Sequence, residues 1–181
     1  MADMGIEIAD HDSRWAEMFD EQRDRVSQVL ARWLVAPPEH IGSTAVSGLR
    51  AKPVVDILAP VGSLVERDVM VKVLSVDGWL YWPDDPKADS RLWFLRPRPE
   101  KRTHHLQVIE HGHPQARALL VFRDALRRDS ALAARYELLK ERLARENPTE
   151  RNAYTNGKAL FVAEALRNAG IEAAVTKDLP E

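Results

Sequence analysis

The strongest constraint on the fold is a short apolar run that carries a single carboxylate. Residues 54–58 read Val-Val-Asp-Ile-Leu and are soon followed by Pro60, so the run predicts a buried central strand. Side chains alternate along a strand, which puts Asp56 and Leu58 on one face and their neighbours on the other. A carboxylate in such a strand needs a cation or hydrogen-bond donors, because burying it unpaired is costly.

A Gly-Ser turn precedes this strand and offers one reason for the carboxylate. Gly42 would allow a ligand to approach the backbone closely, and the hydroxyls of Ser43 and Thr44 could hold a phosphate at the start of a short helix. Lys52 adds a positive charge for the same ligand. Two interpretations stay open: a phosphate site, or an ordinary turn whose Asp56 is satisfied by backbone donors or an arginine.

Hydrophobic periodicity predicts an α+β fold. Expected strands cover 6–8, 39–41, 54–58, 79–82, 92–96 and 105–109, and expected helices cover about 13–34, 65–75, 114–127, 131–145 and 150–168. Because runs of strands precede runs of helices, we expect a mixed or antiparallel sheet flanked by helices, with a C-terminal helical half.

Two adjacent histidines lie in the last expected strand. His105 and Gln107 share one face, whereas His104 points to the core-like other face. We expect His105 beside Asp56, where it would bind one divalent ion with the carboxylate, orient a water, or only hydrogen-bond the carboxylate. His40, beside the Gly-Ser turn, has the same functional and structural alternatives.

The helical half offers further groups for an anion. Tyr154 and Lys158 are four residues apart and therefore neighbours on a helix face. Lys158 could meet a phosphate while Tyr154 presents a hydroxyl or a stacking surface, or the lysine could lie over its own helix with its amine in water. Arg123 could face the ligand or join a solvated stripe. The charged residues of 135–146, Lys140 among them, are expected on a solvated helix face.

The chain resembles the GrpB family, which belongs to the nucleotidyltransferase-fold superfamily, in motifs spread from about residue 6 to residue 169. The matching segments are His40-Ile41-Gly42-Ser43-Thr44-Ala45-Val46, Gly48-Leu49, Ala51-Lys52-Pro53-Val54-Val55-Asp56-Ile57, His104-His105-Leu106, Phe122-Arg123-Asp124, Tyr154, Lys158 and Phe161-Val162. The resemblance implies a nucleotidyltransferase-like fold. In some bacteria a related domain is fused to dephospho-CoA kinase, which suggests a nucleotide or another phosphorylated small molecule as the ligand.

Two departures from the resemblance bear on activity. Active members of the superfamily carry an Asp-x-Asp or Asp-x-Glu pair and a third carboxylate, which together hold two metal ions. Here Leu58 stands two residues after Asp56, and Gln107 stands where the family usually has a histidine. A standard two-metal site is therefore not expected.

The resulting hypothesis is a nucleotidyltransferase-like protein that binds a phosphorylated small molecule in a cleft with one Mg²⁺ or Mn²⁺. The expected catalytic and metal-binding residues are Asp56 and His105, and the expected ligand-binding residues are His40, Gly42, Ser43, Thr44, Lys52, Arg123, Tyr154 and Lys158. The alternative is a catalytically inactive module that binds a nucleotide or CoA precursor, or that serves regulation.

Composition sets the remaining expectations. The 181 residues contain no linker-like stretch, so we expect one domain over 1–181 with a tail that frays from about residue 171. A net charge of -2 gives no overall attraction to nucleic acid or an anionic membrane. The chain has no cysteine, no signal-peptide pattern and no long apolar run, which predicts a cytoplasmic protein. The oligomeric state stays open.

Overall fold

One mixed five-stranded sheet organises the computed structural model, which describes residues 6–171. The strands are β1 (Glu39–Ile41), β2 (Val55–Val61), β3 (Leu80–Tyr81), β4 (Arg91–Arg98) and β5 (Lys101–Glu110). Their spatial order is β1-β2-β5-β4-β3, in which β2 and β5 run parallel and the other neighbours run antiparallel. The predicted mixed sheet is confirmed.

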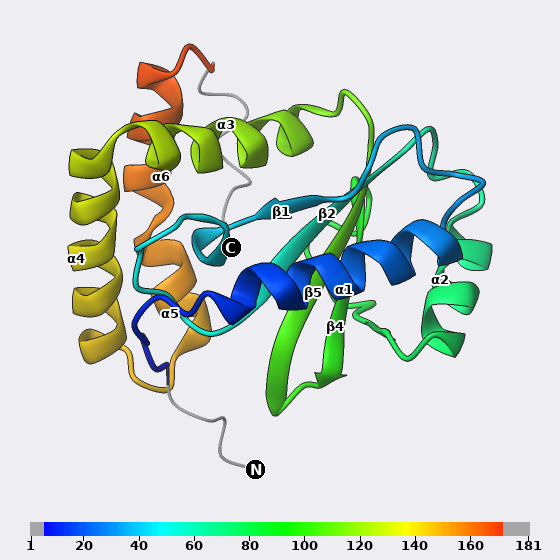
Figure 1. Cartoon of the computed structure of the whole chain (residues 1–181), viewed down its shortest axis with the longest axis horizontal. Helices are drawn as coiled ribbons and strands as arrows, with labels where there is room; N and C mark the ends of the chain where they lie inside the picture. Colours follow the sequence, from blue (N-terminus) through cyan, green and yellow to red (C-terminus); the bar gives the residue numbers. More distant parts are fainter. Residues whose placement is uncertain (1–5, 172–181) are drawn as a thin grey trace.

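Helices flank this sheet and form a separate C-terminal half. They are α1 (Arg14–Val29), the 3-10 turn η1 (Ser43–Ala45), α2 (Arg67–Val76), α3 (Pro114–Arg128), α4 (Ser130–Glu146), α5 (Arg151–Gly157) and α6 (Ala159–Asn168). Figure 1 shows α1 crossing in front of the sheet, with α4, α5 and α6 gathered to one side of it. The α+β class with a C-terminal helical part is therefore also confirmed.

The main hydrophobic core lies between α1 and one face of the sheet. Trp15, Phe19 and Val26 of α1 are buried there, at intervals of four and seven residues, which place them on one helix face. Ile57 of β2 and Leu106 of β5 are register partners and belong to the same cluster. The side chains of β2 that point away from the Asp56 face therefore pack in this core.

The opposite face of the sheet carries the single strand carboxylate. The register pairs Ile41 with Asp56 across β1 and β2, and pairs Asp56 with His105 across β2 and β5. Leu58 lies on this face too, where α3 covers it through Ala116. The predicted alternation of Asp56 and Leu58 against their neighbours is what the structure shows.

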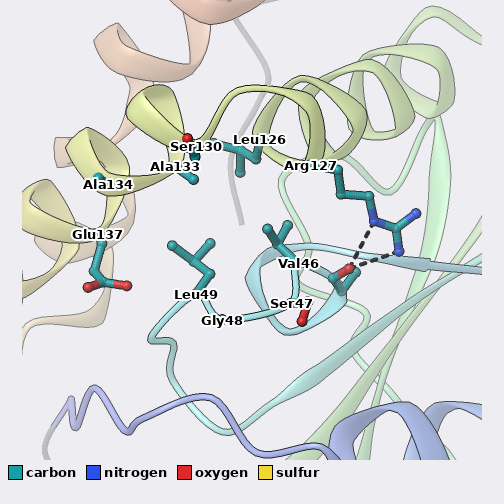
Figure 2. Close-up of a pocket in the computed structure, with 11 residues that line it drawn as sticks. Val46, Ser47, Gly48, Leu49, Leu126, Arg127, Ser130, Ala133, Ala134 and Glu137 are labelled. Carbon is teal, nitrogen blue, oxygen red and sulfur yellow. Dashed lines mark hydrogen bonds between the residues drawn. The ribbon is translucent and has the colours of Figure 1, made fainter.

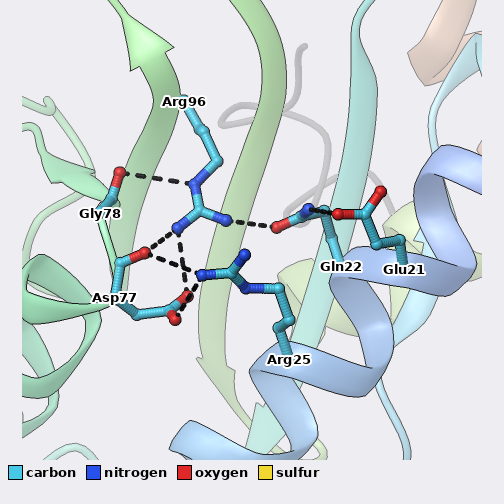
Figure 3. Close-up of polar contacts among 6 residues, drawn as sticks. All are labelled: Glu21, Gln22, Arg25, Asp77, Gly78 and Arg96. Atoms are coloured by element: carbon cyan, nitrogen blue, oxygen red, sulfur yellow. Dashed lines mark hydrogen bonds and ion pairs between the residues drawn. The ribbon is translucent and has the colours of Figure 1, made fainter.

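A polar network joins α1, the end of α2 and β4 at the core side of the sheet (Figure 3). Arg25 and Arg96 both contact the Asp77 carboxylate, at 2.8 Å from Oδ1 and 3.1 Å from Oδ2 respectively. Arg96 also donates to Gln22 Oε1 at 2.5 Å and packs over Trp79. These contacts tie the two helices to β4 on the face of the sheet opposite Asp56, so we assign them to the fold.

Two predicted elements near the start of the chain differ from the structure. Residues 6–8 form no strand, because the chain pairs there through one isolated bridge, Ala9 to Ala51. The first helix ends at Val29 rather than near 34, since Leu34 turns to pair with Val61 at the sheet.

The predicted helix over 150–168 is divided at Lys158 into α5 and α6. Gly157 stands at this break, and a Cβ built there would overlap the side chain of Leu143. A side chain at residue 157 would therefore require Leu143 of α4 to shift. The predicted fraying of the tail concerns residues that lie outside the described range, apart from Ile171. No helix within 6–171 combines the length and apolar character needed to cross a membrane.

Candidate functional site

Asp56 and His105 meet on the face of the sheet opposite α1. His105 Nδ1 lies 2.9 Å from Asp56 Oδ1, and both side chains are mostly buried. An ionised carboxylate can only accept, so this contact has the ring donating from Nδ1. Trp93 packs against the same ring, with centroids 5.2 Å apart. Of the three roles predicted for His105, the hydrogen bond to the carboxylate is present, while metal binding and catalysis stay predictions.

Gly42 closes tightly over the other oxygen of Asp56. A Cβ at residue 42 would overlap Oδ2 and would lie 3.2 Å from the Cβ and Cγ of Asp56. The backbone there has φ +72° and ψ -171°, a region that side chains other than hydrogen rarely tolerate. The predicted close approach therefore exists, but in this structure the approaching group is Asp56.

His40 and Thr44 lie on the core side of the turn. His40 is buried against Phe19, with ring centroids 4.7 Å apart, and its Nε2 lies 3.0 Å from Thr44 Oγ1. The Thr44 hydroxyl lies 3.3 Å from the Val54 carbonyl oxygen, to which it donates. Burial lowers the pKa of His40 to about 4, so the ring is neutral at pH 7. The side chains of His40 and Thr44 are therefore both engaged in holding the turn against the start of β2.

Arg123 is also occupied within the fold. Its guanidinium donates to Glu39 Oε2 at 2.7 Å, to the His40 carbonyl oxygen at 2.9 Å and to Asp124 Oδ1 at 2.8 Å. The side chain is buried, and these charge-assisted bonds join α3 to β1. Arg123 therefore positions the strand that leads into the Gly-Ser turn.

Positive charge converges on the segment just before β2. Burial, and then Arg151, Arg102 and Lys158, lower the pKa of Lys52 to about 8, while Asp56 opposes them. The parallel register of β2 and β5 places Arg102, at the start of β5, beside this segment. Lys52 and Lys158, predicted as ligand-binding residues from distant parts of the chain, are thus near enough for Lys158 to act on Lys52, on which Asp56 acts as well.

The junction of α5 and α6 holds Lys158 in a defined position. The Nζ of Lys158 lies 4.6 Å from the centroid of the Tyr154 ring, so the predicted i, i+4 pair is in contact. Lys158 is only 6% exposed, which excludes an amine that extends into bulk water. Tyr154 is buried as well, and burial raises the pKa of its hydroxyl.

A second Tyr-x-x-x-Lys pair, on α4, was missed from the sequence. The prediction that Lys140 lies on a solvated face was wrong: it is 2% exposed, its Nζ donates to the Arg50 carbonyl oxygen, and it lies 5.0 Å from the Tyr136 ring centroid. Burial, and then Lys158, lower the pKa of Lys140 to about 7. The hydroxyl of Tyr136 reaches Ser43 of the turn, and burial raises its pKa. The spacing shared with the α5 pair was the signal available.

The donor set does not fit a metal held by the protein alone. Leu58, at the position of the second carboxylate, is 1% exposed and packs in the cluster under α3. Gln107, at the position of the expected second histidine, accepts from Arg91 at 2.7 Å. Within the described residues, no group of three or more His, Asp or Glu side chains could hold an ion. Only Asp56 and His105 remain as potential metal ligands among the predicted residues, and these two side chains are hydrogen-bonded to each other.

A groove of about 600 Å³ lies on the outer side of the Gly-Ser turn, between residues 45–49 and the junction of α3 and α4 (Figure 2). Arg127 crosses one end and donates to the Ala45 carbonyl oxygen at 2.8 Å and 3.0 Å. Its lining is mixed, with Leu49 and Leu126 opposite Glu137. Asp56 does not line this groove. The candidate site is therefore defined by the side chains around Asp56 and not by the groove.

The comparisons with known proteins agree over most of the chain. The family model described as GrpB protein matches residues 5–168. The chain is 33% identical over 164 residues to the UPF0157 protein YqkA of Bacillus subtilis, a match that covers 91% of this chain and 47% of YqkA. It is 38% identical over 169 residues to a UPF0157 protein of Pseudomonas aeruginosa, covering 91% of this chain and 67% of the relative. The chain thus spans about half the length of YqkA.

Two solved structures resemble the fold. The crystal structure of GrpB from Enterococcus faecalis superposes with a TM-score of 0.81 at 29% identity, covering 90% of this chain and 96% of that one. A chain of the GLD-2/RNP-8 complex superposes with a TM-score of 0.53 at 10% identity, covering 86% of this chain and 59% of that one. At 10% identity the second likeness concerns the fold alone, which is distantly similar to the nucleotidyltransferase fold.

Proposed function

This chain belongs to the GrpB family, whose fold is distantly similar to that of nucleotidyltransferases, and on that premise we propose that it binds a phosphorylated small molecule, such as a nucleotide, beside Asp56. The ligand's phosphates would lie against Lys52 and Lys158, near the Gly42-Ser43 turn. Fold alone assigns no chemistry, so the proposal depends on the site.

The observation that carries the proposal is that several cations and Asp56 all act on Lys52. Lys52 is repelled by Arg151, Arg102 and Lys158 and attracted by Asp56, so cationic side chains from distant parts of the chain act on the same lysine. Like charges that face one another are unfavourable unless an anion joins them. A phosphate group accepts hydrogen bonds on several oxygens and is the ligand that such a set of donors suits.

The proposal is one of binding and includes no transfer chemistry. Two metal ions held by three carboxylates are what stabilise the attacking and leaving oxygens in phosphoryl and nucleotidyl transfer. Leu58 is packed where the second carboxylate would stand, and its surroundings are apolar. The inactive binding module is therefore the form of the hypothesis that this geometry supports best.

Thermal-shift measurements on the purified chain test the proposal, because a ligand that binds only the folded state raises Tm. The panel would contain nucleotides, CoA precursors and sugar phosphates, each with and without Mg²⁺. We expect at least one to raise Tm, and we expect Lys52→Met to reduce that shift. Lys72→Met, on the exposed side of α2, is the matched control and should leave it unchanged. A panel without any shift would contradict the proposal.

A further inference from the structure

Two tryptophans lie on the same face of the sheet as Asp56, away from the main core. The register pairs Trp93 of β4 with Gln107 of β5, two residues from His105, which is the partner of Asp56. Trp82 follows β3, and its backbone N–H donates to the Trp93 carbonyl oxygen at 2.9 Å, which extends the pairing of β3 with β4 by one residue. Because residues that face each other across antiparallel strands point to the same side, Trp82 and Trp93 share the Asp56 face.

The two indole rings lead from His105 toward solvent. The Trp93 ring centroid lies 5.2 Å from that of His105 and 6.3 Å from that of Trp82. Trp93 is buried, whereas Trp82 and Arg102 are half-buried. The Arg102 guanidinium lies 5.6 Å from the Trp82 centroid and 5.8 Å from the Trp93 centroid, so it borders both rings. The parallel register of β2 and β5 places Arg102 beside the segment that carries Lys52, next to the proposed phosphate site.

A second arginine–tryptophan pair gives a comparison. The Arg32 guanidinium lies 4.3 Å from the Trp33 ring centroid, and both side chains donate to the Glu66 carboxylate. Trp33 also packs against the main core, so its contacts serve the fold. The Trp82 and Arg102 side chains lie instead on the opposite face of the sheet, on the side of Asp56.

An indole beside a guanidinium is suited to a flat heteroaromatic ring. Nucleobases stack on aromatic side chains and on arginine, because every base offers a π face. A sugar phosphate has no such face and would gain nothing from this surface. Resting on the proposed function, we infer that Trp82 and Arg102 form a base-binding part of the site, so that the ligand is a phosphate compound that carries a heteroaromatic base. The ligand class is thus narrowed to nucleotides and their derivatives.

Isothermal titration calorimetry with the four ribonucleoside 5′-monophosphates and ribose 5-phosphate tests this inference, because these ligands share the sugar and the phosphate and differ in the base. At least one nucleotide should bind about tenfold more tightly than ribose 5-phosphate, as expected for one stacked base. Trp82→Ala should weaken nucleotide binding about tenfold and leave ribose 5-phosphate binding unchanged. Trp82→Phe should retain most of the nucleotide affinity, since a phenyl ring still stacks. Trp33→Ala is the matched control and should keep the preference for nucleotides.

The outcomes separate this inference from the proposed function. Equal affinities for ribose 5-phosphate and all four nucleotides would overturn the inference and leave phosphate binding intact. A folded Trp82→Ala variant that kept the full preference for nucleotides would overturn it as well. If none of the five compounds bound, the inference would fall, and the proposed function would fall with it only if the thermal-shift panel also gave no ligand. Should circular dichroism show that Trp82→Ala does not fold, Trp82→Leu takes its place, because leucine keeps an apolar side chain but has no stacking face.

Discussion

Replacing Gly42 by alanine should destabilise the protein far more than a glycine substitution at positive φ usually does. The backbone strain at this φ and ψ costs on the order of 1–3 kcal/mol. The new Cβ would also overlap Asp56 Oδ2 and force the carboxylate to move. That movement breaks the 2.9 Å contact with His105, which adds about 1.5–3 kcal/mol for a hydrogen bond to a charged group. Gly42→Ala should therefore cost about 2.5–6 kcal/mol.

Gly48 is the matched control, because its φ is +77° and a Cβ there would meet nothing within 4 Å. Gly48→Ala should cost only the conformational part, about 1–2 kcal/mol. Urea denaturation followed by circular dichroism measures both free energies of unfolding, provided that the m-values agree. In the double variant Gly42→Ala with Asp56→Ala, the overlap with the carboxylate is gone, so the two costs should be less than additive. Equal costs at the two glycines would refute the proposed contact between the turn and Asp56.

Three further predictions concern buried polar groups and Leu58. Asp85 forms a buried ion pair with Arg91 at 2.7 Å, so Asp85→Ala should lower the free energy of unfolding by about 3–5 kcal/mol. Asp84 is exposed and serves as the control: in the same denaturation assay, Asp84→Ala should change the free energy of unfolding by less than about 0.5 kcal/mol. His40 has a pKa of about 4 in the folded protein and 6.5 in the unfolded chain, so the unfolded chain binds more protons between these pH values. The free energy of unfolding should therefore fall by about 2–3 kcal/mol as the pH drops from 6.5 to 4. His40→Gln should lose less stability over the same range, and an identical pH profile would contradict the prediction. Leu58→Asp should lower the free energy of unfolding by more than about 4 kcal/mol and should not create a Mg²⁺ site, because the new carboxylate is buried in an apolar cluster. A folded Leu58→Asp variant that binds Mg²⁺ in calorimetry would contradict this prediction.

Local sequence patterns were enough to predict much of the fold. The apolar run around Asp56 and its alternation predicted a buried strand with one acid on one face, and the structure has this strand as β2. Pairing of that acid with His105 followed from the same alternation on β5. Helix positions were predictable to within a few residues for α3 and α4, because breaker residues and caps are local signals.

The contacts of the charged side chains depended on the tertiary structure. A lysine four residues after a tyrosine on a charged helix has the same local pattern whether it faces water or another helix, and packing of α4 against the residue 50 segment buried Lys140. The same holds for Arg123, which binds β1, and for His40, which packs on Phe19 of α1. Periodicity determines which way a side chain points from its own element. Only the approach of other elements decides whether that direction leads to solvent, to the core or to a shared site.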